Sequence, residues 1–266
     1  MPIVRVSVGD IELSVLDEGH GLPVLLVHGF PLDHTMWREQ IAALAGKHRV
    51  IAPDLRGFGQ SEVTPGKVTM EQFADDLAAL LAALEVREPV VLCGLSMGGY
   101  IAFQFWRKYA ARLRGLVLCD TKAAPDSEEA AAQRLKLAEL VLRTGVAVLS
   151  DNMLPKLFDQ HTIAHRRDIV ESIQAVVLRS NPQGVAAAQR GMAERPDMRP
   201  ALKDIAAPTL MVVGETDAIS PEAEMREIAA GIPGARLIVV PGAGHMAPLE
   251  RPEGVNPGLL EFLARL

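Results

Sequence analysis

The chain has 266 residues and a formal net charge of −6, with 49% hydrophobic and 23% charged residues. This length suits one large globular domain, and the acidic balance excludes the basic face that nucleic acids and anionic membranes require. Because the sequence contains neither a signal-peptide core nor an apolar run of membrane-spanning length, we expect a cytoplasmic protein.

Strands and helices alternate through the first part of the sequence. Two short alternating segments on either side of Gly9-Asp10 predict a hairpin. Further predicted strands cover 23–28, 49–54, 89–93 and 113–119, and predicted helices cover 35–45, 70–85 and 97–109. The run PVLLVH is continuously apolar, as expected of a strand buried on both faces. This pattern predicts an α/β fold with a mostly parallel sheet and helices on both faces.

The alternation stops at residues 122–195, which carry helix signals and no good strand. Asp126 with Glu129 matches a capping box, and Asn181-Pro182 matches an N-cap followed by a first-turn proline. We therefore predict a helical cap over 122–195, inserted into a core formed by 1–121 and 196–266.

Alternation resumes after the predicted cap. The pattern predicts strands at 207–214 and 235–240, with a helix from Pro221 between them. A short terminal helix is expected to begin at Asn256-Pro257, which again pairs an N-cap residue with a first-turn proline. Cys93 and Cys119 lie in apolar runs and predict buried thiols, and no cysteine–histidine cluster has zinc spacing.

The run VVLCGLSMGGY places Ser96 between Gly94 and Gly98, where a buried strand meets a helix. A serine hydroxyl is a poor nucleophile unless a sharp turn exposes it beside a base. Side chains two residues away on either side would collide in such a turn, so glycine fits there. The pattern predicts Ser96 as a nucleophile.

A nucleophilic serine needs a base and an acid. His245 follows the last strand in a glycine-rich loop at the same sheet edge as Ser96, and we predict it as the base. Asp217 and Asp120 both end strands at that edge, and either side chain can orient an imidazole. Asp217 is favoured because it precedes a helix start and lies between Ser96 and His245 in the chain, and Asp120 remains the alternative.

The other six histidines are predicted to have no catalytic role. His28 ends a strand and His34 opens a helix, so both are interpreted as structural. The remaining four are predicted at the surface: His20, His48, His161 and His165.

An oxyanion needs two converging N–H donors. The first predicted donor is Met97, directly after the nucleophile. The second is Phe30, in the loop after the third strand, and its ring is also a candidate wall of the acyl pocket.

Five motifs together resemble those of α/β-hydrolase-fold esterases: LLVHGFPLDHTMW, APDLRGFGQS, CGLSMGGY, GETDAISP and PGAGHMAPLE. The resemblance covers essentially the whole chain and is strongest to thermostable bacterial carboxylesterases. It implies an eight-stranded sheet, a cap inserted after the sixth strand, and a triad of Ser96, Asp217 and His245. It also implies a structural role for Asp54.

The predicted function is hydrolysis of short-chain carboxylic esters through an acyl-enzyme, without cofactor or metal. The expected partner is a small ester, and a monomer is the default. Alternatives are an enol-lactonase-like lactone hydrolase, a perhydrolase and a non-catalytic binding protein of the same fold. The perhydrolase is considered because Pro31 after Phe30 resembles the oxyanion loop of those enzymes. Met153, Phe158 and Met192 of the cap are candidate pocket residues, although helical spacing of such side chains is also typical of a core.

Overall fold

The core of the molecule is one eight-stranded sheet, seen in a computed structural model that describes residues 3–266. The strands are β1 (Ile3–Val8), β2 (Ile11–Glu18), β3 (Pro23–Val27), β4 (Arg49–Pro53), β5 (Val90–Leu95), β6 (Leu113–Cys119), β7 (Thr209–Gly214) and β8 (Arg236–Val240). Their order is β1-β2-β4-β3-β5-β6-β7-β8; β2 pairs antiparallel with β1 and β4, and the other pairs are parallel. The predicted sheet is thus confirmed. The first two residues of the predicted core segment 1–121 lie outside the described residues.

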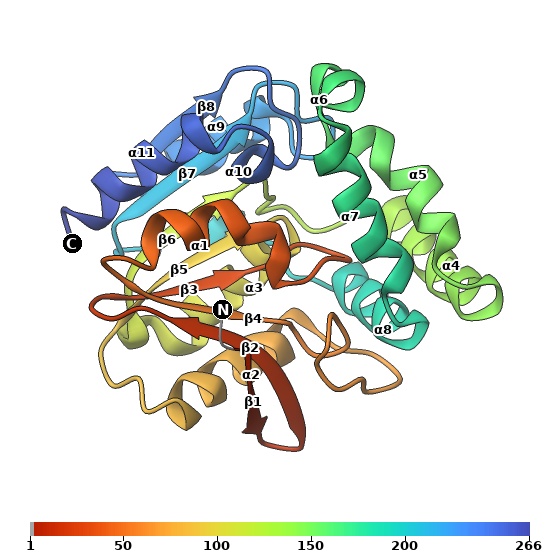
Figure 1. Ribbon diagram of the computed structural model, residues 1–266, viewed down its shortest axis with the longest axis horizontal. Coiled ribbons are helices and arrows are strands. Elements are labelled where there is room, and N and C mark those ends of the chain that lie inside the picture. Colours follow the sequence, from red (N-terminus) through yellow and green to blue (C-terminus); the bar gives the residue numbers. More distant parts are fainter. Residues whose placement is uncertain (1–2) are drawn as a thin grey trace.

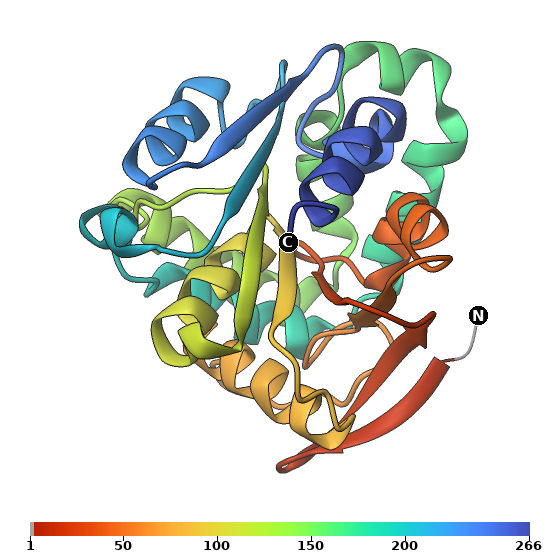
Figure 2. The ribbon, with the colours of Figure 1, turned by 90° about the vertical axis from the view of Figure 1, so that its left-hand side faces the viewer.

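Helices cover both faces of the sheet (Figure 2). One face carries α1 (Arg38–Leu44) and α11 (Pro252–Leu263); the other carries α2 (Met70–Ala83), α3 (Met97–Tyr109) and α9 (Glu222–Gly231). Shorter helical segments lie in the connections: η1 (His34–Trp37), η2 (Ala110–Arg112), η3 (Arg199–Asp204) and α10 (Ala247–Glu250). β3 and β5 are buried at every position, which explains their apolar sequences.

Five α-helices follow β6 before η3 and the return of the chain to the sheet at β7. They are α4 (Glu128–Thr144), α5 (Ala147–Leu157), α6 (Gln160–His165), α7 (Arg167–Arg179) and α8 (Pro182–Ala193). Figure 1 shows them gathered at one end of the sheet, in green and teal. We refer to these five helices as the cap helices.

α8 packs directly against the loop between β4 and α2. Gly184 lies backbone to backbone with Gly57, and Gly191 lies against the carbonyl of Val68, so a Cβ on any of these glycines would overlap main-chain atoms. The Val68 N–H also donates to the Ala187 carbonyl at 3.1 Å. Main-chain contact of this kind leaves no room for a side chain at these three glycine positions.

Two predicted helix starts are confirmed. The Thr69 hydroxyl accepts the Gln72 N–H at the start of α2, at 3.2 Å. The Asn181 side chain accepts the Gln183 N–H at 2.9 Å, directly before Pro182 in the first turn of α8. Both side chains provide acceptors for N–H groups that have no partner within the helix.

The predicted cap residue of α4 is wrong by one position. Ser127 is the N-cap, and its side chain accepts the Ala130 N–H at 3.2 Å. The Asp126 carboxylate instead pairs with the guanidinium groups of Arg134 and Arg195. Burial raises the pKa of Asp126, but the two arginines outweigh it and lower the pKa below its usual range. Two cations hold this carboxylate more strongly than one backbone N–H would.

The terminal helix begins earlier than predicted. α11 starts at Pro252, and Pro257 lies inside it. The Asn256 side chain does not cap a helix: it accepts a hydrogen bond from Gln40 at 2.8 Å and donates to the Glu39 carbonyl at 3.2 Å. These bonds join α11 to α1, so Asn256 has a tertiary role and Pro257 removes only one donor from the helix.

The apolar runs of the sequence fill the interior. Cys93 on β5 and Cys119 on β6 are buried and free, as predicted. The hydrogen bond with Cys93, together with burial, raises the pKa of Cys119 well above its usual range, which keeps this thiol protonated. Between residues 3 and 266, no helix combines the length and the apolar character that crossing a membrane requires.

Candidate active site

Ser96 occupies the sharp turn between β5 and α3. Its φ of +54° and ψ of −110° lie outside the usual regions for L-residues. A Cβ added at Gly94 would overlap the Gly98 carbonyl, and one added at Gly98 would overlap the Val27 carbonyl of β3. The turn therefore requires glycine at both positions, as the sequence pattern predicts. Ser96 itself is half-buried at the start of α3.

The end of β6 holds the backbone of this turn. The Ser96 N–H donates to the Cys119 carbonyl at 2.9 Å, and the Thr121 hydroxyl donates to the Ser96 carbonyl at 2.7 Å. Gly99 makes room for Thr121, because a Cβ there would overlap the threonine hydroxyl. Both peptide groups of the strained serine are thus fixed by the end of β6 and the loop that follows it.

His245 and Asp217 form a buried pair on the loops after β8 and β7. The distance from His245 Nδ1 to Asp217 Oδ2 is 2.8 Å. Asp217 Oδ1 accepts the N–H groups of Ile219 at 2.7 Å and Ser220 at 3.0 Å. Burial raises the pKa of Asp217, but His245 and these N–H groups outweigh it and hold the pKa below its usual range. A carboxylate at Nδ1 places the proton of a neutral ring there and leaves Nε2 free to accept a proton.

Asp120, the alternative acid, lies beside Asp217. Its side chain is completely buried, and its Oδ1 accepts the Gly214 N–H at 2.8 Å. Over the described chain, the His245 ring hydrogen-bonds to Asp217 and not to Asp120. Burial and the nearby charge of Asp217 raise the pKa of Asp120 well above its usual range. This geometry favours Asp217 as the partner of His245.

The loop after β3 reaches the Ser96 turn. A Cβ added at Gly29 would lie 3.6 Å from the Ser96 Cβ, so the next residue, Phe30, follows a segment packed on the turn. Met97 is the first residue of α3, and its N–H has no acceptor within the helix. The two predicted oxyanion donors therefore lie on segments that flank Ser96. The Phe30 ring packs edge-on against Phe58, with centroids 6.0 Å apart.

The remaining histidines have other surroundings. His28 is completely buried, and its Nε2 accepts the Leu55 N–H at 3.0 Å. Burial lowers its pKa, so the ring is neutral with its proton on Nδ1, 2.9 Å from the Gly29 carbonyl. His20, His161 and His165 are exposed, as predicted, whereas His48 is half-buried after α1.

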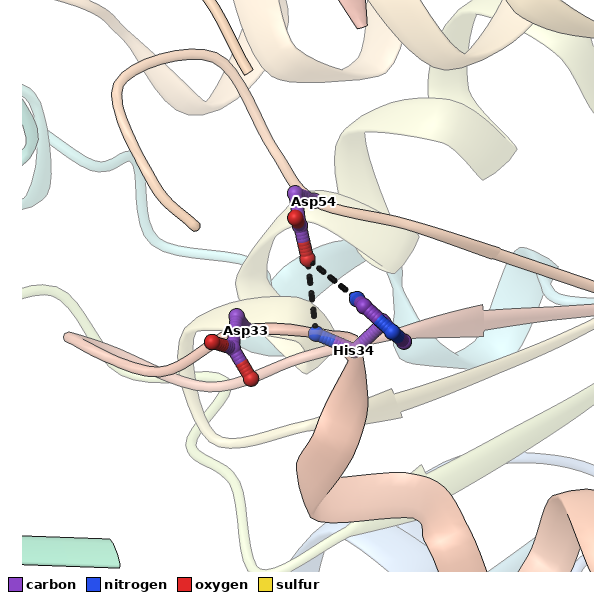
Figure 3. Close-up of side chains that lie close together, drawn as sticks. All are labelled: Asp33, His34 and Asp54. Carbon is purple, nitrogen blue, oxygen red and sulfur yellow. Dashed lines mark hydrogen bonds and ion pairs between the residues drawn. The ribbon is translucent and has the colours of Figure 1, made fainter. Parts of the chain in front are cut away.

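Asp33 and His34, in the loop after β3, form a compact polar cluster with Asp54, which follows β4 (Figure 3). Asp54 Oδ1 lies 2.6 Å from His34 Nδ1 and also accepts the His34 N–H at 3.0 Å. Asp33 accepts both the N–H and the hydroxyl of Thr35 and pairs with Arg179 of α7 at 2.5 Å.

The cluster has the spacing of a metal site, because three possible ligand atoms lie within 4.8 Å of one another. However, N–H and O–H donors already occupy its carboxylate oxygens, and the Arg179 guanidinium opposes a cation. Burial lowers the pKa of His34, but Asp54 outweighs burial and the net pKa is raised. Burial likewise raises the pKa of Asp54, but His34 outweighs it and the net pKa is lowered. An ion pair that joins the loops after β3 and β4 fits these observations.

Sequence reasoning missed Glu250. This completely buried carboxylate of α10 accepts the Gly244 N–H and the Asp159 N–H, each at 2.8 Å. It thereby ties the residue before His245 to the start of α6. Burial raises the pKa of Glu250 despite these bonds. The available signal was one acidic residue in the apolar run MAPLE, directly after the histidine.

The three predicted pocket residues have different positions. Phe158 is buried at the end of α5, and its backbone lies against Gly244, next to His245. Met192 is buried in α8 with its sulfur 3.5 Å from Arg134, and Met153 is half-buried in α5. Of the three, Phe158 is the one placed at the histidine loop.

A cavity of about 800 Å³ lies between α3, α4 and α9. Its wall includes Tyr100, over whose ring the Arg195 guanidinium stands at 4.5 Å, and Ile219 from the loop that holds Asp217. Within the described part of the chain, this cavity is lined by neither Ser96 nor His245, nor by the predicted pocket residues. It is therefore separate from the candidate catalytic groups.

The sheet order, the strained serine turn and the aspartate–histidine pair are features of one class of protein. The chain matches the alpha/beta hydrolase fold family over residues 23–252, a span that includes Ser96, Asp217 and His245. It therefore belongs to the α/β-hydrolase-fold family, and the resemblance inferred from the motifs is confirmed.

Three relatives place the chain within this family. A thermophilic esterase from Thermogutta terrifontis, solved with malate bound, is 49% identical; the match covers 100% of this chain and 99% of that one, with a TM-score of 0.97. The enol-lactonase from Burkholderia xenovorans is 29% identical, with coverage of 98% and 100% and a TM-score of 0.91. A putative non-heme bromoperoxidase of Mycobacterium tuberculosis is 31% identical, with coverage of 96% and 98%. Hydrolase activity follows from the family and from its esterase members.

Proposed function

We propose that the protein is a serine carboxylesterase that hydrolyses short-chain esters through an acyl-enzyme. The observation that carries this proposal is the 2.8 Å pairing of His245 with Asp217 at the sheet edge where Ser96 stands in a strained turn. Similarity to a thermophilic esterase over the full length of the chain supports an ester as substrate.

Acylation is the first step. His245 Nε2 takes the Ser96 hydroxyl proton as Oγ attacks the ester carbonyl carbon. The N–H groups of Phe30 and Met97 stabilise the resulting oxyanion, aided by the positive end of α3. Protonated His245, stabilised by Asp217, then gives its proton to the alkoxy oxygen, and the alcohol leaves.

Deacylation repeats the same proton transfers with water. His245 takes a proton from water as the hydroxyl oxygen attacks the acyl carbon. Collapse of the second oxyanion breaks the bond to Ser96 Oγ, which recovers its proton from His245. The carboxylic acid leaves, and the enzyme returns to its starting state without a cofactor entering either step.

Covalent labelling tests this proposal. A fluorophosphonate should modify Ser96, and peptide mass spectrometry should locate the label, while nitrophenyl acetate hydrolysis is lost in proportion. Ser96→Ala should be neither labelled nor active. Ser7→Ala, a change of an exposed serine on β1, is the matched control and should behave as the wild type. A label on another serine, or an active Ser96→Ala variant, would contradict the nucleophile.

The same groups can also open a lactone, which is an internal ester. The similarity to an enol-lactonase makes a lactone hydrolase the second candidate. Comparing kcat/KM for nitrophenyl butyrate with values for a panel of lactones decides between the two. Replacing water by peroxide in deacylation would give the perhydrolase reaction, which a peracid assay measures. A binding protein would show neither labelling nor turnover.

A further inference from the structure

The last residue of β6 and the two that follow it contact both parts of the proposed site. Cys119 and Thr121 hold the two peptide groups of Ser96, as described above. Asp120, between them, has a φ of +46°, a conformation that non-glycine residues seldom adopt. In this conformation the side chain reaches Gly214 at the end of β7.

The Asp120 carboxyl group meets two groups there. Its Oδ1 accepts the Gly214 N–H at 2.8 Å, and the Asp217 carboxyl group is near enough to raise its pKa. The Gly214 carbonyl in turn accepts the Asp217 N–H at 3.2 Å. Gly214 at the end of β7 therefore binds the Asp120 carboxyl group through its N–H and the Asp217 backbone through its carbonyl.

The two carboxyl groups differ in the donors around them. Asp217 accepts three hydrogen bonds, from Ile219, Ser220 and His245. Asp120 accepts one, and its buried Oδ2 has no donor among the described residues. A completely buried carboxylate with one donor is strongly disfavoured, and two adjacent carboxylates resist being charged together. The negative charge therefore belongs on Asp217.

We propose that Asp120 is a positioning residue that stays uncharged at neutral pH and donates its Oδ2 proton to the Asp217 carboxylate. This inference rests on the proposed function, because it gives Asp120 a role only through the Asp217–His245 pair. The hydrogen bond supplies Asp217 with a further donor, fixes the plane of its carboxylate toward Nδ1, and removes what would otherwise be an unpaired buried oxygen.

The electrostatic surroundings agree with this arrangement. Burial, followed by the charge of Asp217, raises the pKa of Asp120 well above its usual range. The titratable groups that face it are Asp217 and the Cys119 thiol, and the pKa of that thiol is also raised. Neither group offers a cation that would stabilise a charged Asp120.

Two substitutions separate an uncharged donor from a required carboxylate. Asp120→Asn keeps an acceptor for Gly214 and places an amide N–H where the carboxyl proton was. Because both hydrogen bonds of the side chain are preserved, this variant should retain kcat within about threefold of the wild type. Asp120→Ala should lower kcat about 10- to 100-fold with little change in KM, the scale expected for a lost hydrogen bond to a charged group.

The pH profile supplies a readout that a purely structural role would not move. Without its donor, Asp217 holds the protonated His245 ring more tightly, so the acidic limb of the kcat profile should move to higher pH in Asp120→Ala and stay in place in Asp120→Asn. Val117→Ala, a cavity-forming change on the same buried strand, is the control. It should lower stability without moving the limb.

Infrared difference spectroscopy tests the protonation state even if Asp120→Ala fails to fold. The wild type at neutral pH should show the C=O stretch of a carboxylic acid that Asp120→Asn lacks. Absence of that difference, equal damage from Asn and Ala, or a fully active Ala variant with an unmoved pH limb would each overturn the proposal. The infrared band does not depend on turnover, so this failure is distinguishable from failure of the Ser96 labelling test.

Discussion

The Glu250 carboxylate lies 2.8 Å from the backbone nitrogen of Asp159, and this bond joins α10 to the start of α6. The other carboxylate oxygen accepts the N–H of Gly244, the residue before His245. One buried side chain thus couples the position of the proposed base to the position of the cap helices.

Glu250→Gln should therefore lower both stability and activity, although Glu250 is not proposed to contact the substrate. An amide has one acceptor oxygen, so one of the two buried N–H groups loses its partner, at a cost of about 1–3 kcal/mol. We expect a lower melting temperature and a lower kcat. Glu253→Gln, an exposed change on α11, is the control and should alter neither. Wild-type kcat and stability in Glu250→Gln would show that this link does not hold the histidine loop.

The acid can be identified by comparing two isosteric changes. Asp217→Asn should lower turnover by about 10⁴-fold, because an amide favours the wrong imidazole tautomer. Asp120→Asn should cost little. Steady-state kinetics with nitrophenyl acetate measures both, and circular dichroism checks that both variants fold. If the two penalties are reversed, the acid follows β6 instead of β7.

The rate should depend on pH through the base. Protonating His245 removes the acceptor for the Ser96 proton, so kcat/KM should fall as the pH is lowered. Single-turnover acylation isolates the chemical step from product release. A rate that stays constant between about pH 5 and 8, where histidine ordinarily titrates, would argue against a histidine base.

The His34–Asp54 pair should make stability depend on pH in two directions. The pKa of His34 is raised above its ordinary value of 6.5, so its contribution is complete below that value and is lost as pH rises through the folded-state pKa. The pKa of Asp54 is lowered below 3.8, so its contribution is present above that value and is lost as pH falls through the folded-state pKa.

His34→Gln tests the upper limit of this range. Its deficit in the free energy of unfolding should be largest below pH 6.5 and should shrink as the pH rises above it. Urea denaturation at a series of pH values measures the difference. His161→Gln, at an exposed position, should show no such trend. A deficit that does not vary with pH would mean that His34 contributes through packing and not through its charge.

Substrate size should show a maximum. Each added methylene of the acyl chain gains about 0.8 kcal/mol while it enters free apolar space, and costs about 1–3 kcal/mol once it meets packed walls. We expect kcat/KM to rise from acetyl to about propionyl or butyryl nitrophenyl esters and to fall steeply beyond about six to eight carbons. A maximum at about ten carbons or more, or activation at an oil interface, would indicate a lipase-like channel.

The parts of the site that sequence alone could predict are those with local causes. The Ser96 turn requires glycines two residues away on either side, and this steric demand is visible in six consecutive residues. The loops of Asp217 and His245 follow strands whose carboxyl ends must meet in a parallel sheet. For the same reason, the alternation of strands and helices sufficed to predict the sheet.

The parts that sequence could not predict depend on partners far along the chain. Asp126 is a residue type that favours helix N-caps, but in the fold its carboxylate forms an ion pair with Arg195 instead. Asn256 resembles a helix start until Gln40 of α1 is found beside it. Glu250 has no local pattern, because its two N–H partners come from separate loops. In each case, residues distant in the sequence determine which hydrogen bonds or ion pairs the side chain forms.

The cap helices should differ in how well they tolerate mutation, because α8 contacts the core through glycines and α4 and α5 do not. Gly57, Gly184 and Gly191 admit no side chain, so almost any substitution there would push α8 away from the core. α4 and α5 carry many exposed or half-buried positions and can vary more freely. In natural divergence or in a mutant library, substitutions should therefore accumulate in α4 and α5 while these three glycines stay constant.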